Sequence, residues 1–359
     1  MKVDGKPYRT IWLGPDGATV QAIDQTLLPH RFVVRDFKRM EDAERAIRTM
    51  IVRGAPLIGA AAAYGMALAM AEDPSDGMLV RAYETLLASR PTAVNLRWAL
   101  DDLRALLSPL PPARRREAAY KRAAEICDED VEICRNIGER GLAEFRRIKP
   151  KGDRLNVLTH CNAGWLATVD WGTALAPVYK AHDAGIPLHV WVDETRPRNQ
   201  GASLTAWELS KHGIPHTVIA DNAGGHLMQH GQVDMVIVGA DRVTSAGDVC
   251  NKIGTYLKAL AAYDNDIPFY AAVPSPTLDW TISDGLREIP IEERDANEVA
   301  SISGRLADGT IASVALLPTG STAGNPAFDV TPARLVTGII TERGICTPDQ
   351  LFSLFAEHK

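Results

Sequence analysis

Apolar residues recur at helical spacing through most of the first 150 residues. Strong helix formers fill these segments, while proline and glycine are confined mostly to the joints between them. Two short β-rich runs flank a turn of glycine, proline and aspartate before the first helix, which indicates a small β meander. The predicted strands are Tyr8–Leu13 and Ala18–Ile23, and the predicted helices are Glu41–Val52, Pro56–Ala71, Leu79–Ala88, Ala93–Leu107 and Pro112–Ile148.

The pattern changes after the segment Lys149–Asp153, where short uninterrupted apolar runs alternate with helical segments. Such runs are typical of parallel strands covered on both faces. We therefore expect an α/β fold in which residues 1–150 form a mainly helical domain and residues 151–359 a Rossmann-like parallel sheet. The predicted strands are Leu155–Leu158, Leu188–Val192, His216–Ala220, Met235–Val238 and Phe269–Val273, with helices at Leu204–His212 and Ile253–Tyr263.

Composition narrows the class of partner. The 359-residue chain is 46% hydrophobic and 23% charged, which suits two globular domains. A net charge of −6 argues against nucleic-acid binding, so we expect a small-molecule substrate. The odd number of cysteines, five, and the absence of an apolar leader core in Met1–Leu13 favour a reducing cytoplasm.

The uncharged segment Gly54–Ala71 is about long enough to cross a membrane. Alanine and glycine dominate it, however, and large aliphatic residues are few. This composition favours a helix buried inside the protein over a membrane span.

Two polar segments, Thr159–Gly164 (THCNAG) and Gly239–Val243 (GADRV), each follow an apolar strand pattern. Ligands of parallel sheets collect outside the carboxyl ends of the strands, so Cys161 and Asp241 can face one pocket. The apolar strand end before Asp241 favours its protonated form, which suits a general acid. The alternatives are that Cys161 is an inert buried residue, and that Asp241 caps a helix or pairs with Arg242.

Two further loops carry groups that could bind a polar or anionic ligand. In Asp193–Gly201, Gln200 can bond hydroxyls, and Arg196 and Arg198 can pair with acidic groups or phosphate, although the loop can equally be a solvated surface. Asn251 and Lys252 are expected at the start of a helix, where the helix dipole favours an anion.

The linker before the second predicted helix is a candidate phosphate site. Pro56 suits the first helical position, which leaves the amides of Gly54 and Ala55 free beside Arg53. The alternative is a simple turn. Arg97, within a predicted helix, is a weaker candidate, because helical arginines are usually surface charges.

Taken together, these motifs resemble the 5-methylthioribose-1-phosphate isomerase family of methionine salvage. The resemblance covers nearly the whole chain, and it implies a homodimer that uses neither a metal nor an organic cofactor. It also implies that Arg53, Gly54, Ala55, Arg97, Gln200, Asn251 and Lys252 bind substrate, that Asp241 donates a proton, and that Cys161 moves a proton or stabilises the transition state. The matching segments are Arg53–Gly59, Asn95–Trp98, Thr159–Gly164, Glu194–Gly201, Gly239–Arg242, Asn251–Thr255, Ile291–Arg294 and Asn325–Pro332.

Two other functions stay open within the same superfamily. One is a regulatory subunit of a translation initiation factor exchange complex, which binds partners without this chemistry. The other is a ribose-1,5-bisphosphate isomerase, which differs in the substituent at C5 of the sugar. The joint presence of Cys161 and Asp241 favours an enzyme.

Overall fold

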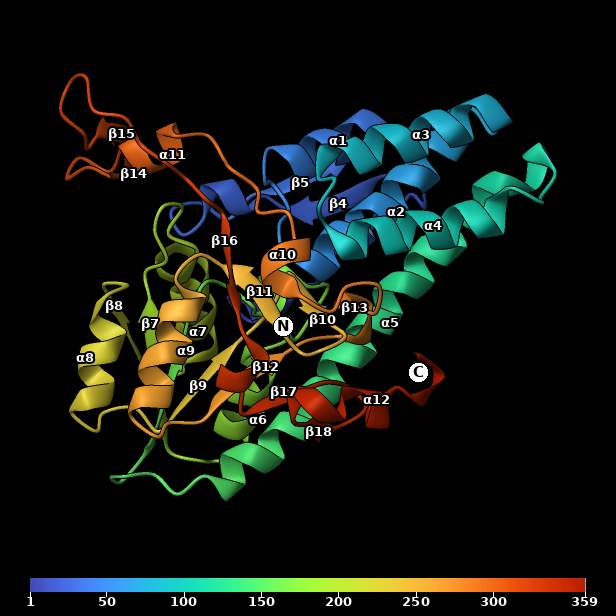
Figure 1. Cartoon of the computed structure of the whole chain (residues 1–359). Coiled ribbons are helices and arrows are strands. Elements are labelled where there is room, and N and C mark those ends of the chain that lie inside the picture. Colours follow the sequence, from blue (N-terminus) through green and yellow to red (C-terminus); the bar gives the residue numbers. More distant parts are fainter. Residues whose placement is uncertain (359) are drawn as a thin grey trace.

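The computed structural model describes residues 1–358 and shows a helical half and a half built on a large sheet (Figure 1). A three-stranded antiparallel sheet lies at the start of the chain, in the order β3 (Ile11–Leu13), β4 (Val20–Ile23) and β5 (Val34–Phe37). It contains the predicted meander, in which Ile11 pairs with Ala22. A still shorter hairpin, β1 (Lys2–Val3) and β2 (Lys6–Pro7), precedes it.

The five predicted helices are all present, with ends that differ by a few residues. They are α1 (Met40–Arg48), α2 (Ala55–Glu72), α3 (Asp76–Ser89), α4 (Val94–Leu107) and α5 (Pro112–Arg147). Helix α2 is the one helix in residues 1–358 long and apolar enough to cross a membrane, and 83% of its most apolar stretch is buried. It packs against α1, α3, α4 and α5, so the prediction of a buried helix is confirmed.

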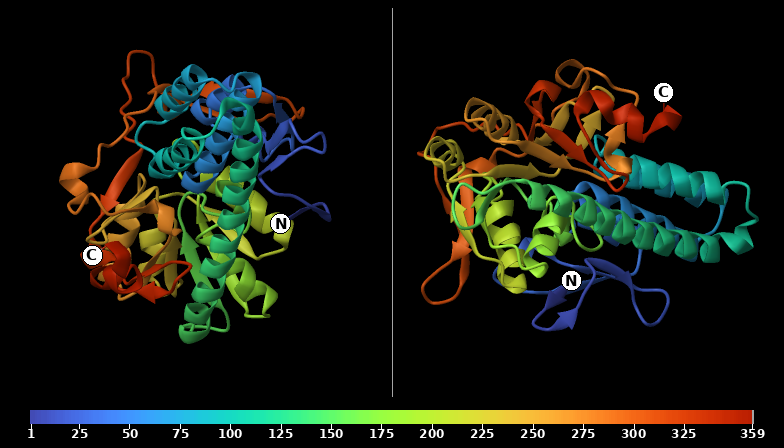
Figure 2. Two further views of the ribbon diagram at one scale, coloured as in Figure 1. Left: turned by 90° about the vertical axis from the view of Figure 1, so that its right-hand side faces the viewer. Right: turned by 90° about the horizontal axis from the view of Figure 1, so that it is seen from below.

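Helix α5 joins the two halves (Figure 2). Its 36 residues extend about 54 Å at the usual helical rise. It packs on α2 in the helical half and on α6 (Leu175–Asp183) beside the large sheet. The division of the chain near residue 150 stays a prediction, because the end of α5 is built into the core of the second half through Ile137 and Phe145.

The large sheet has seven strands in the order β18-β17-β12-β9-β6-β7-β8. All neighbouring pairs are parallel except β17 with β18. All five predicted strands are present, joined by two that were not foreseen. They are β6 (Leu155–Thr159), β7 (Leu188–Asp193), β8 (His216–Ile219), β9 (Met235–Val238), β12 (Phe269–Ala272), β17 (Gly338–Ile340) and β18 (Ile345–Cys346).

Helices cover both faces of this sheet. Apolar residues of α5, α6 and α7 (Ala206–His212) form one core, and those of α8 (Ala223–Gln229), α9 (Thr255–Asp264) and α12 (Leu351–Leu354) form the other. The chain leaves β6 toward β7 on one side and leaves β9 toward β12 on the other. The neighbouring strands β6 and β9 therefore mark a topological switch point, where loops diverge and leave a crevice.

The sequence pattern did not predict a second sheet and a hairpin that follow β9. The second sheet has the order β13-β10-β11-β16, and the hairpin projects from the body with the short helix α11 beside it (Figure 1). The strands are β10 (Arg242–Thr244), β11 (Val249–Lys252), β13 (Leu278–Asp279), β14 (Ser301–Arg305), β15 (Ile311–Ala315) and β16 (Phe328–Thr331), and the short helices are α10 (Gly285–Glu288) and α11 (Asn297–Ala300).

Candidate active site

A cavity of about 40 Å³ lies between the helical half and the switch point of the large sheet. Cys161 follows β6 and Asp241 follows β9, so the two neighbouring strands bring both residues to its wall. Gly239 permits this approach, because a Cβ there would lie 2.6 Å from the Cβ of Ala163. Eight of the nine residues to which the family resemblance gives a role line the cavity: Arg53, Gly54, Ala55, Cys161, Gln200, Asp241, Asn251 and Lys252.

Arg97 is the exception, since it does not line this cavity, and its role as a ligand stays a prediction. It lies exposed on α4, on the opposite face from the buried Asn95, Leu96 and Ala99. Arg90, which the sequence analysis did not consider, lines the cavity instead. It stands in the turn before α4, and its side chain is 10% exposed and pairs with Glu292 at 3.3 Å. The sequence signal that could have pointed to Arg90 is its position directly before Pro91, between two predicted helices.

The backbone of Cys161 is fixed on both sides. Its N–H donates to the hydroxyl of Thr195 (2.8 Å), and its carbonyl accepts from Thr205 (2.7 Å). The residue has φ +65°, a conformation that costs a non-glycine residue about 1–3 kcal/mol and clusters at functional sites. Burial raises the pKa of the Cys161 thiol, and the positive charges of Arg53 and Lys252 oppose this rise.

Asp241 directly precedes β10, and Lys252 ends the neighbouring strand β11 of the second sheet. The Asp241 N–H donates to the Cys250 carbonyl (2.9 Å), and the residue is half-buried. The Lys252 ammonium donates to Ala327 O (2.9 Å) and lies 4.3 Å from the centre of the Phe328 ring. Burial lowers the pKa of Lys252, and the negative charges of Cys161 and Asp241 oppose that fall.

The expected helical position of Asn251 and Lys252 is wrong. They end strand β11, and α9 begins only at Thr255. The Asn251 amide donates to the Thr255 hydroxyl (3.0 Å), which in turn donates to the Lys252 carbonyl (2.7 Å). Pairing of β11 with β16, which the sequence did not indicate, extends the strand through these residues.

Arg53 is held by the loop that carries Cys161. Its guanidinium donates to Asn162 Oδ1 (2.5 Å) and to the Asn162 carbonyl (2.9 Å). The Asn162 amide donates to the buried carboxylate of Glu208 (2.9 Å), which also accepts from Tyr179 (2.6 Å) and from two backbone amides of the same loop. Arg53 therefore depends on a network that begins in α7.

Helix α2 points its N-terminus at the cavity. The helix begins at Ala55 with a proline in its first turn, as expected from the sequence. Gly54 has φ +101° and lies against the backbone of Ala167, where an added Cβ would come within 2.6 Å of Ala167 Cα. Only glycine fits this contact without displacement.

In the loop after β7, two arginines bind other residues of the protein, whereas Gln200 lines the cavity. Arg196 donates to the Val299 carbonyl (2.9 Å), and Arg198 pairs with Glu298 (2.9 Å). Both arginines thus already have protein partners. Gln200 is buried, and its Oε1 has no hydrogen-bond partner within residues 1–358.

A larger cavity of about 390 Å³ adjoins the inner one. Met50, Arg53 and Gln200 line both. The inner cavity holds only a few water molecules, at about 10–15 Å³ each. A ligand larger than a few water molecules must therefore extend from the inner cavity into the outer one.

Among the described residues, one group has the arrangement of a metal site: His160, Asp193 and Asp221. The Lys258 ammonium lies 3.2 Å from Asp193 Oδ2 and also donates to the Asp221 carbonyl. A protein cation already fills the position that a metal would need, so this group does not fit a metal site.

The chain matches known proteins along nearly its whole length. The model of the initiation factor 2 subunit family matches residues 51–348. Methylthioribose-1-phosphate isomerase of Rhodospirillum rubrum is 65% identical, over 96% of this chain and 90% of the relative.

Two solved structures are similar over 98% of this chain. Pyrococcus horikoshii 5-methylthioribose 1-phosphate isomerase has a TM-score of 0.84 at 41% identity, with 97% of its own chain covered. The structure described as translation initiation factor eIF-2B subunit delta from A. fulgidus has 0.79 at 39%, with 100% covered. The curated relatives at about 65% identity carry the isomerase name. The chain therefore belongs to the initiation factor 2 subunit family and, within it, to the methylthioribose-1-phosphate isomerases.

Proposed function

We propose that this protein isomerises 5-methylthioribose 1-phosphate to 5-methylthioribulose 1-phosphate in methionine salvage. The observation that carries the proposal is the shared cavity of Cys161 and Asp241, with the cations Arg53 and Lys252 in the same wall. The names of the relatives support the same reaction.

The substrate explains why an acid is needed. An ordinary aldose opens to a free aldehyde before it isomerises, but the anomeric oxygen of this substrate carries phosphate. Ring opening therefore requires protonation of the ring oxygen while the C1 oxygen stays phosphorylated. We assign this proton to the carboxyl of Asp241, which reaches the cavity from β9.

The phosphate is assigned to the positive side of the cavity. Arg53 and the amides of Gly54 and Ala55, at the N-terminus of α2, form an anion site. Arg90 adds a further guanidinium, and its buried Nε has no hydrogen-bond partner in residues 1–358. Arg97 lies exposed on α4, and its role as a ligand stays a prediction.

The remaining ligands suit the sugar hydroxyls. The unpartnered Oε1 of Gln200 can accept a hydrogen bond from a sugar hydroxyl, and Asn251 and Lys252 line the cavity from the end of β11. With the phosphate in the inner cavity, the 5-methylthio group extends past Met50 into the outer one. The open outer cavity also suits the related 5-deoxyribose 1-phosphate.

Hydrogen transfer between C2 and C1 has two routes. The Cys161 thiolate can shuttle a proton, or it can stabilise charge while a hydride moves. Turnover in deuterated water distinguishes them, because substantial solvent deuterium at C1 excludes a pure hydride shift.

The proposed function predicts large losses from two conservative variants. Cys161→Ala and Asp241→Asn should each lower kcat by about 10²–10⁴-fold, because each removes an acid or base group. The measurement is turnover of methylthioribose 1-phosphate, with circular dichroism to confirm folding. Near wild-type turnover in either variant contradicts the assignment.

A wild-type protein that is inactive while it binds a translation-factor partner would instead support the regulatory-subunit alternative. A preference for ribose 1,5-bisphosphate as substrate would support the alternative that the protein is a ribose-1,5-bisphosphate isomerase.

We also propose a cytoplasmic homodimer. Five free, buried cysteines are consistent with a reducing compartment, and sedimentation analysis tests the dimer.

A further inference from the structure

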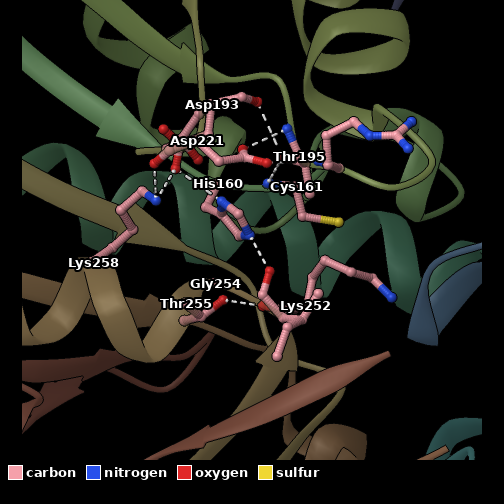
Figure 3. A network of polar contacts seen from close by, with 12 residues as sticks. His160, Cys161, Asp193, Thr195, Asp221, Lys252, Gly254, Thr255 and Lys258 are labelled. Carbon is pink, nitrogen blue, oxygen red and sulfur yellow. Dashed lines mark hydrogen bonds and ion pairs between the residues drawn. The ribbon is translucent and has the colours of Figure 1, made fainter. Parts of the chain in front are cut away.

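His160 lies between two hydrogen-bond acceptors (Figure 3). Its Nδ1 is 2.8 Å from Asp193 Oδ2, and its Nε2 is 2.8 Å from the carbonyl of Ile253. A neutral imidazole carries one N–H, so it can satisfy only one of these acceptors. We propose that His160 is held as an imidazolium and is a positioning residue for Cys161.

The Asp193 carboxylate also forms an ion pair with a lysine. The Lys258 ammonium lies 3.2 Å from the same oxygen, Oδ2, that faces His160. The ammonium favours a negative charge on this oxygen, so a proton between Oδ2 and His160 Nδ1 belongs on the ring. Both His160 and Asp193 are almost completely buried, so water does not replace either partner.

Charged groups from four other elements surround the His160 ring. Asp193 ends β7, Asp221 follows β8, Lys258 lies on α9 and Asp329 lies on β16. The Asp221 carboxylate accepts the N–H groups of residues 195 and 196, and the Asp329 carboxylate accepts those of residues 254 and 256. Three carboxylates thus face one ammonium, and an imidazolium reduces the remaining excess of negative charge.

The ring connects the segments that carry the catalytic groups. His160 immediately precedes Cys161, and Ile253 immediately follows Lys252. Gly254 lies against the ring, since a Cβ there would come within 3.0 Å of His160 Cε1. Loss of the ring proton would place a lone pair against an acceptor 2.8 Å away, and the Cys161 loop would separate from β7 or from the Lys252 strand.

A second buried histidine provides a matched control. His189 lies on β7, and neither of its ring nitrogens has a hydrogen-bond partner within the described part of the chain. Burial lowers the pKa of His189, so this ring is neutral at neutral pH. The two buried histidines should therefore differ in protonation in the same sample.

Nitrogen NMR of the protein labelled at the histidine rings tests the protonation directly. At pH 8 we expect one ring with two N–H groups, whose signals disappear in His160→Gln and persist in His189→Gln. In Asp193→Asn the imidazolium loses its counter-charge, and the ring should carry one N–H. A wild-type spectrum at pH 8 without a doubly protonated ring overturns the proposal, whether or not the variants fold.

Kinetics test the positioning role, which rests on the proposed function. His160→Gln should lower kcat by about 10²-fold with little change in KM, because a displacement of about 1 Å at a reacting group has that effect. His189→Gln should keep wild-type kcat. Wild-type kcat in His160→Gln overturns the positioning role. If wild-type protein does not turn over the sugar phosphate, the proposed function fails, while the NMR result on His160 still stands.

Discussion

At the scale of single residues, the reactivity of Cys161 reflects burial opposed by positive charge. Burial raises its pKa, and Arg53 and Lys252 lower it. Lys252 is the better residue to replace, because Arg53 also holds the Cys161 loop through Asn162. Methionine in place of Lys252 keeps an unbranched side chain against Phe328 and removes the charge together with the hydrogen bond to the Ala327 carbonyl.

Lys252→Met should therefore shift the pH dependence of Cys161 alkylation to higher pH. The thiolate is the reacting form, and loss of a nearby cation makes it harder to form. The measurement is the rate of iodoacetamide addition to the Cys161 peptide, followed by mass spectrometry across pH. Lys180→Met, which removes a lysine that pairs with Glu139 and does not line the cavity, should leave the curve in place. An unmoved curve in Lys252→Met contradicts the assigned electrostatics.

The residue scale is also where sequence reasoning was least complete. Local signals located the strand-end Cys161 and Asp241 and the helix start at Ala55. They did not separate Arg90 from Arg97, because the choice depends on which face of α4 is buried against its neighbours. They also did not reveal His160, whose partners Asp193 and Ile253 lie on distant segments.

At the scale of elements, long periodic segments were predictable, and short paired ones were not. The helices of the first half and the buried strands of the large sheet carry their own hydrophobic pattern. Strands such as β10 and β16 have only three or four residues and exist through pairing with distant partners. The second sheet and the β14–β15 hairpin therefore could not be predicted from periodicity.

The contact between α5 and α6 gives a prediction at this scale. A Cβ on Gly141 would lie 2.7 Å from Pro177 Cβ, against a rigid ring. Gly141→Ala should lower the free energy of unfolding by about 1–2 kcal/mol, because overpacking costs more than the gain in helix propensity. Gly138, one turn earlier, faces mainly the flexible end of Lys180, so Gly138→Ala should be nearly neutral. Urea unfolding compares the two, and equal stabilities would contradict this packing.

At the scale of the whole molecule, the candidate site exists only where the two halves meet. Arg53, Gly54 and Arg90 come from the helical half, and Cys161 and Asp241 come from the large-sheet half. The Arg53–Asn162 hydrogen bonds and the contact of Gly54 with Ala167 hold the halves in register at this point. Activity should therefore depend on this contact more strongly than stability does.

Gly54→Ala tests that dependence. The new Cβ would come within 2.6 Å of Ala167 Cα, and φ +101° adds strain, so the N-terminus of α2 must move away from the Cys161 loop. A shift of about 1 Å should lower kcat/KM by about 10²-fold. Gly213→Ala is the matched control, because Gly213 also has a positive φ, +77°, but no atom within 4 Å of an added Cβ. It should lose about 1 kcal/mol of stability and keep its activity. Equal kcat/KM values in the two variants would mean that backbone strain, and not the meeting of the two halves at Gly54, controls the site.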